Sequence, residues 1–349
     1  MAHASNDFAA LVVRWQRRHG RHDLPWQRTR DPYRVWLSEV MLQQTQVTTV
    51  LAYYERFLAR FPDVRALAAA PLDDVLALWS GLGYYRRARH LHRCAQQVVS
   101  EHGGEFPRDS AALARLPGIG RSTAAAIAAF CFGERAAILD GNVKRVLARV
   151  HGIADDLSQP RAVRAMWSRA EALLPARGIE AYTQGLMDLG ATVCTLRSPR
   201  CDACPLAGRC VARAEGEPQR YPAKARRAAR GRRTHALLWL QHGRRLWLVQ
   251  RPGTGVWASL WSLPEFASDE ALSGMVAGWP GGGEWLTPIE HALTHFDWAL
   301  HPWRHVLPAR LDAAARRRIE AAIGAGRWFD RDDALRQGLP APVRRLLES

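Results

Sequence analysis

Hydrophobic residues recur at steps of three and four positions through the first two thirds of the chain, from about residue 8 to residue 211. Positions 35, 36, 40 and 41 are one example, and this spacing places apolar side chains on one face of an α-helix. Proline and glycine interrupt the pattern often, and Asp31-Pro32 has the sequence of a helix start, a capping residue before a proline. We therefore predict a domain of short helices packed against one another.

Beyond residue 233 the pattern changes to short runs rich in β-forming residues. Thr234–Leu240 and Leu246–Gln250 are two such runs, and a turn-like sequence separates them. We predict a helical domain over residues 1–215, a linker over 216–233 and a mixed α/β domain over 234–349, whose length is ordinary for one domain.

The predicted linker ends in a basic segment. Six of the ten residues from Lys224 to Arg233 are Lys or Arg. Such a run favours a tether that lies against an acidic partner, and a solvated tether with no bound state is the alternative.

Composition narrows the class of protein. With 48% hydrophobic and 23% charged residues, the 349-residue chain can bury real cores. The formal charge of +16 favours a polyanionic partner, with nucleic acid ahead of an acidic membrane. The first twenty residues lack the apolar core of a secretion signal, and the most apolar uncharged run, residues 122–133, is too short to span a bilayer. We expect an intracellular protein.

Four cysteines lie within seventeen residues, at Cys194, Cys201, Cys204 and Cys210. Four thiolates on so short a segment would repel one another unless a soft cation held them, so the array indicates a structural metal site. The spacing alone fits a four-thiolate zinc site and a [4Fe–4S] cluster equally well. Cys94 and Cys131 lie in apolar helical patterns and are expected in the core.

A glycine-rich turn precedes the helix that begins near residue 121. Its sequence runs from Leu116 to Ala124 and contains Gly118 and Gly120, followed by Arg121 and Ser122. Glycines at this spacing let backbone N–H groups approach an anion at a helix N-terminus. Because helices flank the turn on both sides, we predict a helix-hairpin-helix, over about residues 113–130, that binds a DNA phosphate. A plain connection between helices is the alternative.

Two carboxylates stand out by their surroundings. Glu39 lies in an otherwise apolar, uncharged helix. Desolvation there would raise the pKa of its carboxyl toward the range of a general acid. The alternative is that Glu39 is an ordinary charge on the helix surface. Asp140 lies between an apolar run and a turn, in the sequence Ile138–Lys144. It fits a catalytic carboxylate and a simple helix cap equally well.

Taken together, these motifs resemble those of adenine-specific mismatch DNA glycosylases, the MutY family. The segment 37–47, the turn 81–85, the hairpin, the segment 138–145 and the cysteine loop occur in the family's order. The resemblance implies an all-helical helix-hairpin-helix glycosylase part with an iron–sulfur loop, followed by a Nudix-like α/β domain. It also implies a [4Fe–4S] cofactor on the four cysteines.

The resemblance assigns roles residue by residue. Glu39 would protonate adenine N7 and then activate water, while Asp140 would stabilise the oxocarbenium-like sugar, one carboxyl neutral and the other ionised. Asn142 would help to place water or the sugar phosphate. Gln44 and Tyr84, with Leu82 beside them, match positions that wedge into the duplex, because the target base must leave the stack before reaction.

Ser122 distinguishes this chain from endonuclease III, a relative that shares the hairpin, the aspartate and the cluster loop. Lyases of that group carry a nucleophilic lysine where this chain has Ser122. Without an amine no Schiff base with the sugar forms, so we expect a monofunctional enzyme that leaves the strand intact.

The C-terminal part resembles the Nudix-like domain with which the family reads 8-oxoguanine opposite adenine. The Glu-rich metal-binding helix of Nudix hydrolases is lacking after Gly253, so a pyrophosphatase is disfavoured. The family's Phe-Ser-His recognition loop is Leu293-Thr294-His295 here. We expect Thr294 and His295 to contact the lesion.

The function that follows is removal of adenine mispaired with 8-oxoguanine or guanine in base excision repair. The expected partner is double-stranded DNA containing such mispairs, without membrane association, and the expected protein is monomeric and nucleoid-associated. The two alternatives are an endonuclease III-like lyase for oxidised pyrimidines, disfavoured by Ser122, and a non-catalytic damage sensor, disfavoured by the joint presence of Glu39 and Asp140.

Overall fold

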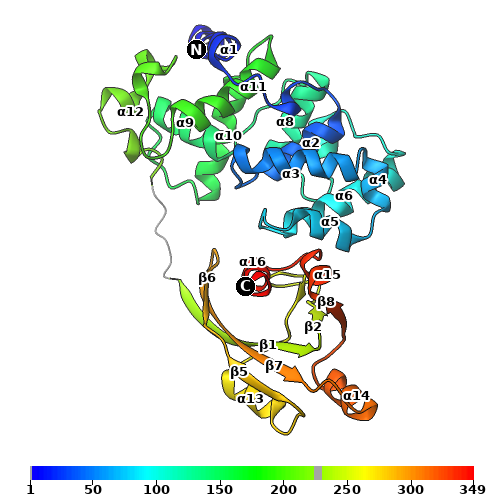
Figure 1. Ribbon diagram of the computed structural model, residues 1–349. Coiled ribbons are helices and arrows are strands. Elements are labelled where there is room, and N and C mark those ends of the chain that lie inside the picture. The colour runs from blue at the N-terminus through cyan, green and yellow to red at the C-terminus, as the bar shows by residue number, and fades with distance from the viewer. Residues whose placement is uncertain (1, 224–229) are drawn as a thin grey trace. The chain divides into compact units, whose positions relative to one another are not determined.

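The computed structural model describes residues 2–223 and 230–349 and divides them into two compact units (Figure 1). The first comprises residues up to 68 and from 93 to 223, and the second comprises residues 69–92 and 230–349. This division differs from the predicted domains in that residues 69–92, which lie within the helical part of the sequence, group with the C-terminal part. Residues 224–229 of the basic segment lie outside the described residues.

Helices make up the first unit, as the three- and four-residue spacing predicted. Including α4 and α6, which run across the division, its main helices in chain order are α1 (Ala2–His19), the single turn η1 (Pro25–Gln27), α2 (Pro32–Leu42), α3 (Val47–Arg60), α4 (Val64–Ala69), α6 (Arg86–His102), α7 (Ser110–Leu113), α8 (Arg121–Phe132), α9 (Gly141–His151), α10 (Pro160–Ala172), α11 (Ile179–Asp188) and α12 (Val211–Ala214). A π-helical turn (Leu189–Val193) continues α11 toward the cysteines, and the turns Cys201–Ala203, Ala207–Arg209 and Pro218–Arg220 follow.

Local sequence accounts for where the helices begin and how they pack. Asp31 caps α2 by accepting a hydrogen bond from the Tyr33 N–H at 2.9 Å, with Pro32 at the first helical position. The fully buried Val12 of α1 and Leu147 of α9 belong to one apolar core to which α10 and α11 also contribute. Helix α11, whose far end leads to the cysteines, thus packs on the same core as α9.

A mixed sheet forms the centre of the second unit. Its strands are β1 (Gly231–His242), β2 (Arg245–Gln250), β3 (Trp261–Ser262), β4 (Glu265–Phe266), β5 (Gly282–Trp285), β6 (Ile289–Ala292), β7 (Phe296–Leu307) and β8 (Gly326–Asp330). Strands β1 and β7 run parallel through all twelve residues of β1, while β2 pairs with β1 and β8 in antiparallel register. The two predicted strands are thus confirmed, and β1 begins three residues earlier than predicted, inside the predicted linker.

Helices cover both faces of this sheet, and the burial of β1 shows why. Residues 236–240 of β1 are all buried, with Leu237 and Trp239 in one core and Ala236, Leu238 and Leu240 in the other. Successive side chains of a strand point to opposite faces, so an unbroken apolar run requires cover on both. The helices of this unit are α5 (Leu72–Trp79), α13 (Asp269–Val276), α14 (Ala313–Ala322), α15 (Arg331–Leu335) and α16 (Ala341–Glu348). Figure 1 shows α13 on one side of the sheet and α15 and α16 on the other.

Candidate active site and nucleic-acid interface

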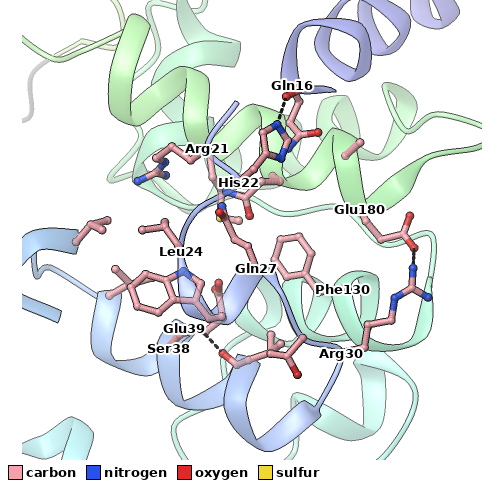
Figure 2. A pocket seen from close by; sticks show the side chains of 18 residues that line it. Gln16, Arg21, His22, Leu24, Gln27, Arg30, Ser38, Glu39, Phe130 and Glu180 are labelled. Carbon is pink, nitrogen blue, oxygen red and sulfur yellow. Dashed lines mark hydrogen bonds and ion pairs between the residues drawn. The ribbon is translucent and has the colours of Figure 1, made fainter. Parts of the chain in front are cut away.

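Glu39 lies on α2 and lines a cavity of about 330 Å³ in the first unit (Figure 2). Its neighbours along the helix, Ser38 and Val40, are buried. Burial, together with the negative charge of Asp140, raises the pKa of Glu39 to about 8. Glu39 is therefore predominantly protonated at neutral pH, as a general acid must be. The sequence prediction of a desolvated carboxyl at this position is confirmed.

Asp140 is the N-cap of α9, and its Oδ1 accepts a hydrogen bond from the Val143 N–H at 2.7 Å. Burial raises the pKa of Asp140, while hydrogen bonds from the N–H groups of Val143 and Asn142 oppose that rise, as does the charge of Arg145. The helix-cap interpretation is therefore correct, and it is compatible with a catalytic role because the cap fixes the carboxylate. Asp140 lies close enough to influence the titration of Glu39 but does not line the same cavity.

Arg21 and Gln184, which line the cavity, are both held by Asp188, a fully buried carboxylate at the end of α11. Its two oxygens accept hydrogen bonds from the backbone N–H of Arg21 at 3.0 Å and from the Arg21 Nε at 2.6 Å. The Gln184 Nε2 donates to the same carboxylate at 3.0 Å. Asp188 and Arg21 were missed in the sequence, although Asp188, like Glu39, is an acid in an apolar helix.

Asn142 is connected to the cysteine loop by Arg145, one helical turn further along α9. The Arg145 Nη2 donates to the Asn142 Oδ1 at 2.8 Å and to the Gly190 carbonyl at 2.6 Å, and the Nε donates to the Cys194 carbonyl at 2.7 Å. Gly190 packs so closely that a Cβ there would lie 2.4 Å from the Asn142 Cβ. A glycine is therefore required at position 190 for Asn142 to hold this position.

The predicted hairpin is present between α7 and α8. Gly118 adopts a positive φ of 77°, a conformation that favours glycine, and Gly120 is the residue before the first turn of α8. The Ser122 Oγ accepts a hydrogen bond from the Leu139 N–H at 2.9 Å. Ser122 therefore holds the segment that leads directly into Asp140.

Arg121 at the start of α8 is engaged within the protein. Its guanidinium forms an ion pair with Glu171 and lies 3.9 Å from the centre of the Trp167 ring, both on α10. Arg121 would have to exchange the Glu171 carboxylate for a phosphate in order to bind DNA directly, and its predicted DNA contact stays a prediction.

The four predicted cysteine ligands line one cavity, together with apolar residues of α9 and the π-helical turn. Within the part of the chain that the structure describes, no three His, Cys, Asp or Glu side chains converge as a single metal ion would require. Of the two remaining cysteines, Cys94 is fully buried and Cys131 is partly buried.

The second unit has a separate cavity of about 630 Å³. The turn 81–85 forms one side, with Tyr84 half-exposed at a positive φ of 48°, and Leu293 and Thr294 of the β6–β7 turn lie on another. Leu82 is buried, and His295 is exposed outside this cavity. The structure thus brings Tyr84 and Thr294 to the same cavity.

Trp257 and His291 also line this cavity and were missed in the sequence. The Trp257 ring stacks on Trp298 with 4.6 Å between centroids, and its φ of 56° is strained for a bulky side chain. No spacing in the sequence reveals such a stack. In the first unit, Gln44 lies exposed just after α2, also at a positive φ of 57°.

The fold and site define a class of protein. Residues 37–171 match the HhH-GPD superfamily of base excision DNA repair proteins, and residues 235–349 match the NUDIX domain. A structure of a thermostable thymine-DNA glycosylase is similar, with a TM-score of 0.56, 28% identity and coverage of 62% of this chain and 100% of that one. An endonuclease III–DNA complex shares the fold, with a TM-score of 0.51, 21% identity and coverage of 62% of this chain and 98% of that one.

Curated relatives narrow the class to one family. The adenine DNA glycosylase of Buchnera aphidicola subsp. Schizaphis graminum is 32% identical over 98% of this chain and 98% of its own length. The human adenine DNA glycosylase is 35% identical over 86% of this chain and 65% of its own length. The chain belongs to the adenine DNA glycosylase family. Among the described residues, no helix has the length and apolar character needed to cross a membrane.

Proposed function

We propose that the protein removes adenine mispaired with 8-oxoguanine or guanine from double-stranded DNA, by hydrolysis of the N-glycosidic bond. The observation that carries this proposal is the pairing of a protonated acid, Glu39, with a capped carboxylate, Asp140, whose charge acts on it. Two carboxyl groups held in different protonation states are what cleavage of a glycosidic bond requires.

The reaction follows from the protonation states. Adenine is extruded from the stack into the cavity beside Glu39, whose carboxyl donates its proton to adenine N7 and makes the base a neutral leaving group. The bond between the base nitrogen and the sugar C1′ breaks, and the Asp140 carboxylate stabilises the positive charge that develops on the sugar. Water adds to C1′ and returns a proton to Glu39. Asn142, held by Arg145, helps to place the water or the sugar phosphate.

The reaction ends at the abasic site. The residue in the hairpin where a lyase would need an amine is Ser122, whose hydroxyl is occupied by the Leu139 N–H. A serine in this position supplies no Schiff base, so the strand stays intact.

We further propose that the cavity of the second unit reads the base opposite adenine. It combines an exposed aromatic ring, Tyr84, with the Thr294 hydroxyl, and adenine itself is an undamaged base that gives no signal of damage. One good polar contact to a base is worth about ten- to a hundredfold in discrimination. Thr294→Ala should therefore reduce the preference for 8-oxoguanine:A over G:A about tenfold, and an unchanged preference would remove Thr294 from this role.

The four cysteines fit a polynuclear metal group, and we propose a [4Fe–4S] cluster with a structural role. Supporting this is that all four thiols line one shared cavity. When bound, such a cluster cross-links the loop 194–210 to the end of α11. Protein purified anaerobically should contain iron and acid-labile sulfide, and stoichiometric zinc without iron would contradict the proposal.

The net charge of +16 supports DNA as the partner, and we propose that the protein acts on it as an intracellular, nucleoid-associated monomer.

The catalytic assignment is tested by Glu39→Gln and Asp140→Asn. Both should bind mispaired DNA, yet lose at least about a hundredfold in single-turnover base release, because the first cannot donate a proton and the second carries no charge. Glu180→Gln is a matched control, since Glu180 lies partly exposed at the same cavity in an ion pair with Arg30. Release by Glu39→Gln at a rate close to that of the unaltered protein would refute the assignment.

A further inference from the structure

Arg149 of α9 is one of the most deeply buried charged side chains of the described residues, with 2% of its surface exposed. Its guanidinium contacts the start of the cysteine loop and the segment that follows the loop. The Nε donates to the Pro218 carbonyl at 2.7 Å and the Nη1 donates to the Thr195 carbonyl at 2.7 Å. Further donor contacts reach the carbonyls of Tyr221 (3.2 Å), Cys194 (3.4 Å) and Leu196 (3.1 Å).

The same residue touches two of the four sulfurs. The Arg149 Nη1 lies 3.3 Å from the Cys194 Sγ, and the Cys210 Sγ lies 3.4 Å from the Arg149 backbone carbonyl. Arg149 itself lines the cavity that the four cysteines line.

The Arg149 guanidinium donates to several backbone carbonyls. Among the described residues, however, no carboxylate lies within 4 Å of it. Carbonyl oxygens satisfy the donors but carry no net charge, and a buried cation without an opposite charge is costly. A second guanidinium, that of Arg145, also reaches Cys194, and its Nε donates to the Cys194 carbonyl at 2.7 Å. The guanidinium groups of Arg145 and Arg149 thus both contact Cys194. A negative charge on the cysteine sulfurs would offset their positive charge.

We propose that Arg149 is the internal counter-ion of the metal–thiolate group on Cys194, Cys201, Cys204 and Cys210, and that it sets both the retention and the reduction potential of that group. This inference rests on the proposed cofactor. Four thiolates around an iron–sulfur core carry a net negative charge, which the guanidinium offsets at contact distance. Net charge and hydrogen bonds to sulfur are the terms through which a protein tunes such a potential.

Three variants separate the charge of Arg149 from its hydrogen bonds. Arg149→Met removes both, so the reduction potential should become more negative, because one-electron reduction adds negative charge that no cation then offsets. Iron should also leave for a chelator about ten- to a hundredfold faster, as expected when an outer-shell partner of a metal site is lost. Arg149→Lys keeps the charge but cannot reach all the carbonyls, so it should lose iron faster while its potential stays near that of the unaltered protein.

Arg197→Met is the matched control, because Arg197 lies on the same loop but is exposed. It should leave the potential and the rate of iron loss unchanged. The measurements are the iron-to-protein ratio, iron release to a chelator followed by visible absorption, and the potential by voltammetry of the full-length protein.

The outcomes are distinguishable. If the unaltered protein binds no iron, the proposed cofactor is wrong and this inference falls with it. If iron is bound and Arg149→Met keeps both its potential and its iron, the inference alone is wrong. A potential that shifts equally in Arg149→Met and Arg149→Lys would also overturn it, because the charge would then have no part in the effect.

Discussion

The rate of adenine release should depend on pH through Glu39. The structure places the pKa of this carboxyl at about 8, because burial disfavours the charged form and Asp140 adds a second negative charge. At pH 7 about nine tenths of such a group is protonated, whereas a carboxyl of ordinary pKa near 4.5 would be protonated in only about one molecule in three hundred. At neutral pH the protonated fraction of Glu39 is thus about three hundred times that of a carboxyl with an ordinary pKa.

The sign of the dependence follows from the raised pKa. Single-turnover release from a G:A duplex should be flat from an acid limit set by Asp140 up to about pH 8, and should fall about tenfold per pH unit above pH 8. A fall on the acid side should begin above the ordinary pKa of an aspartate, because burial also raises the pKa of Asp140, whose ionised form is the active one. Rapid-quench measurements between pH 4 and pH 10, at saturating enzyme, resolve both limits.

Glu39→Gln provides the matched comparison, because its residual release should show no alkaline fall near pH 8. A rate that declines from pH 5 upward in the unaltered protein would show that Glu39 has an ordinary pKa. The same would follow if Glu39→Gln kept the alkaline limit, since another group would then be responsible. Either result would refute the argument from burial.

Three further predictions follow from single contacts. Borohydride should trap no enzyme–DNA adduct, because Ser122 offers no amine; efficient trapping, or strand cleavage without base or heat, would contradict this. Gly190→Ala should slow base release at least about tenfold, because the added Cβ displaces Asn142. Gly208→Ala is the control and should not slow release, because an added Cβ at position 208 meets nothing within 4 Å. Equal rates in both variants would show that the close packing at Gly190 is unimportant. Asp188→Asn should destabilise the protein by about 3 kcal/mol in urea unfolding, because it leaves the Arg21 guanidinium without its buried partner; a loss below about 1 kcal/mol would contradict that.

Local features of this protein could be predicted from sequence. The Asp31 cap, the apolar helix around Glu39 and the two strands near the start of the C-terminal part each depend on residues a few positions apart, and the structure shows all of them. Helical spacing and strand alternation are properties of the chain itself.

What sequence did not predict depends on contacts between distant segments. Asp188 and Arg21 are 167 positions apart, and the six acceptor atoms of Arg149 come from the start of the cysteine loop and from the segment after the loop. The stack of Trp257 on Trp298 requires that a strained loop meet strand β7. The grouping of residues 69–92 with the C-terminal part likewise follows from packing and not from any local pattern.

Base release from a panel of defined duplexes tests the central claim most directly. The panel should pair adenine with 8-oxoguanine, guanine and thymine, and should include duplexes with an oxidised pyrimidine or a G:T mispair. We predict release of free adenine from the 8-oxoguanine:A and G:A duplexes, with none from A:T and with intact strands until alkali is added. Release of thymine or of an oxidised pyrimidine, or tight binding of the 8-oxoguanine:A duplex with no base released, would contradict the proposed function.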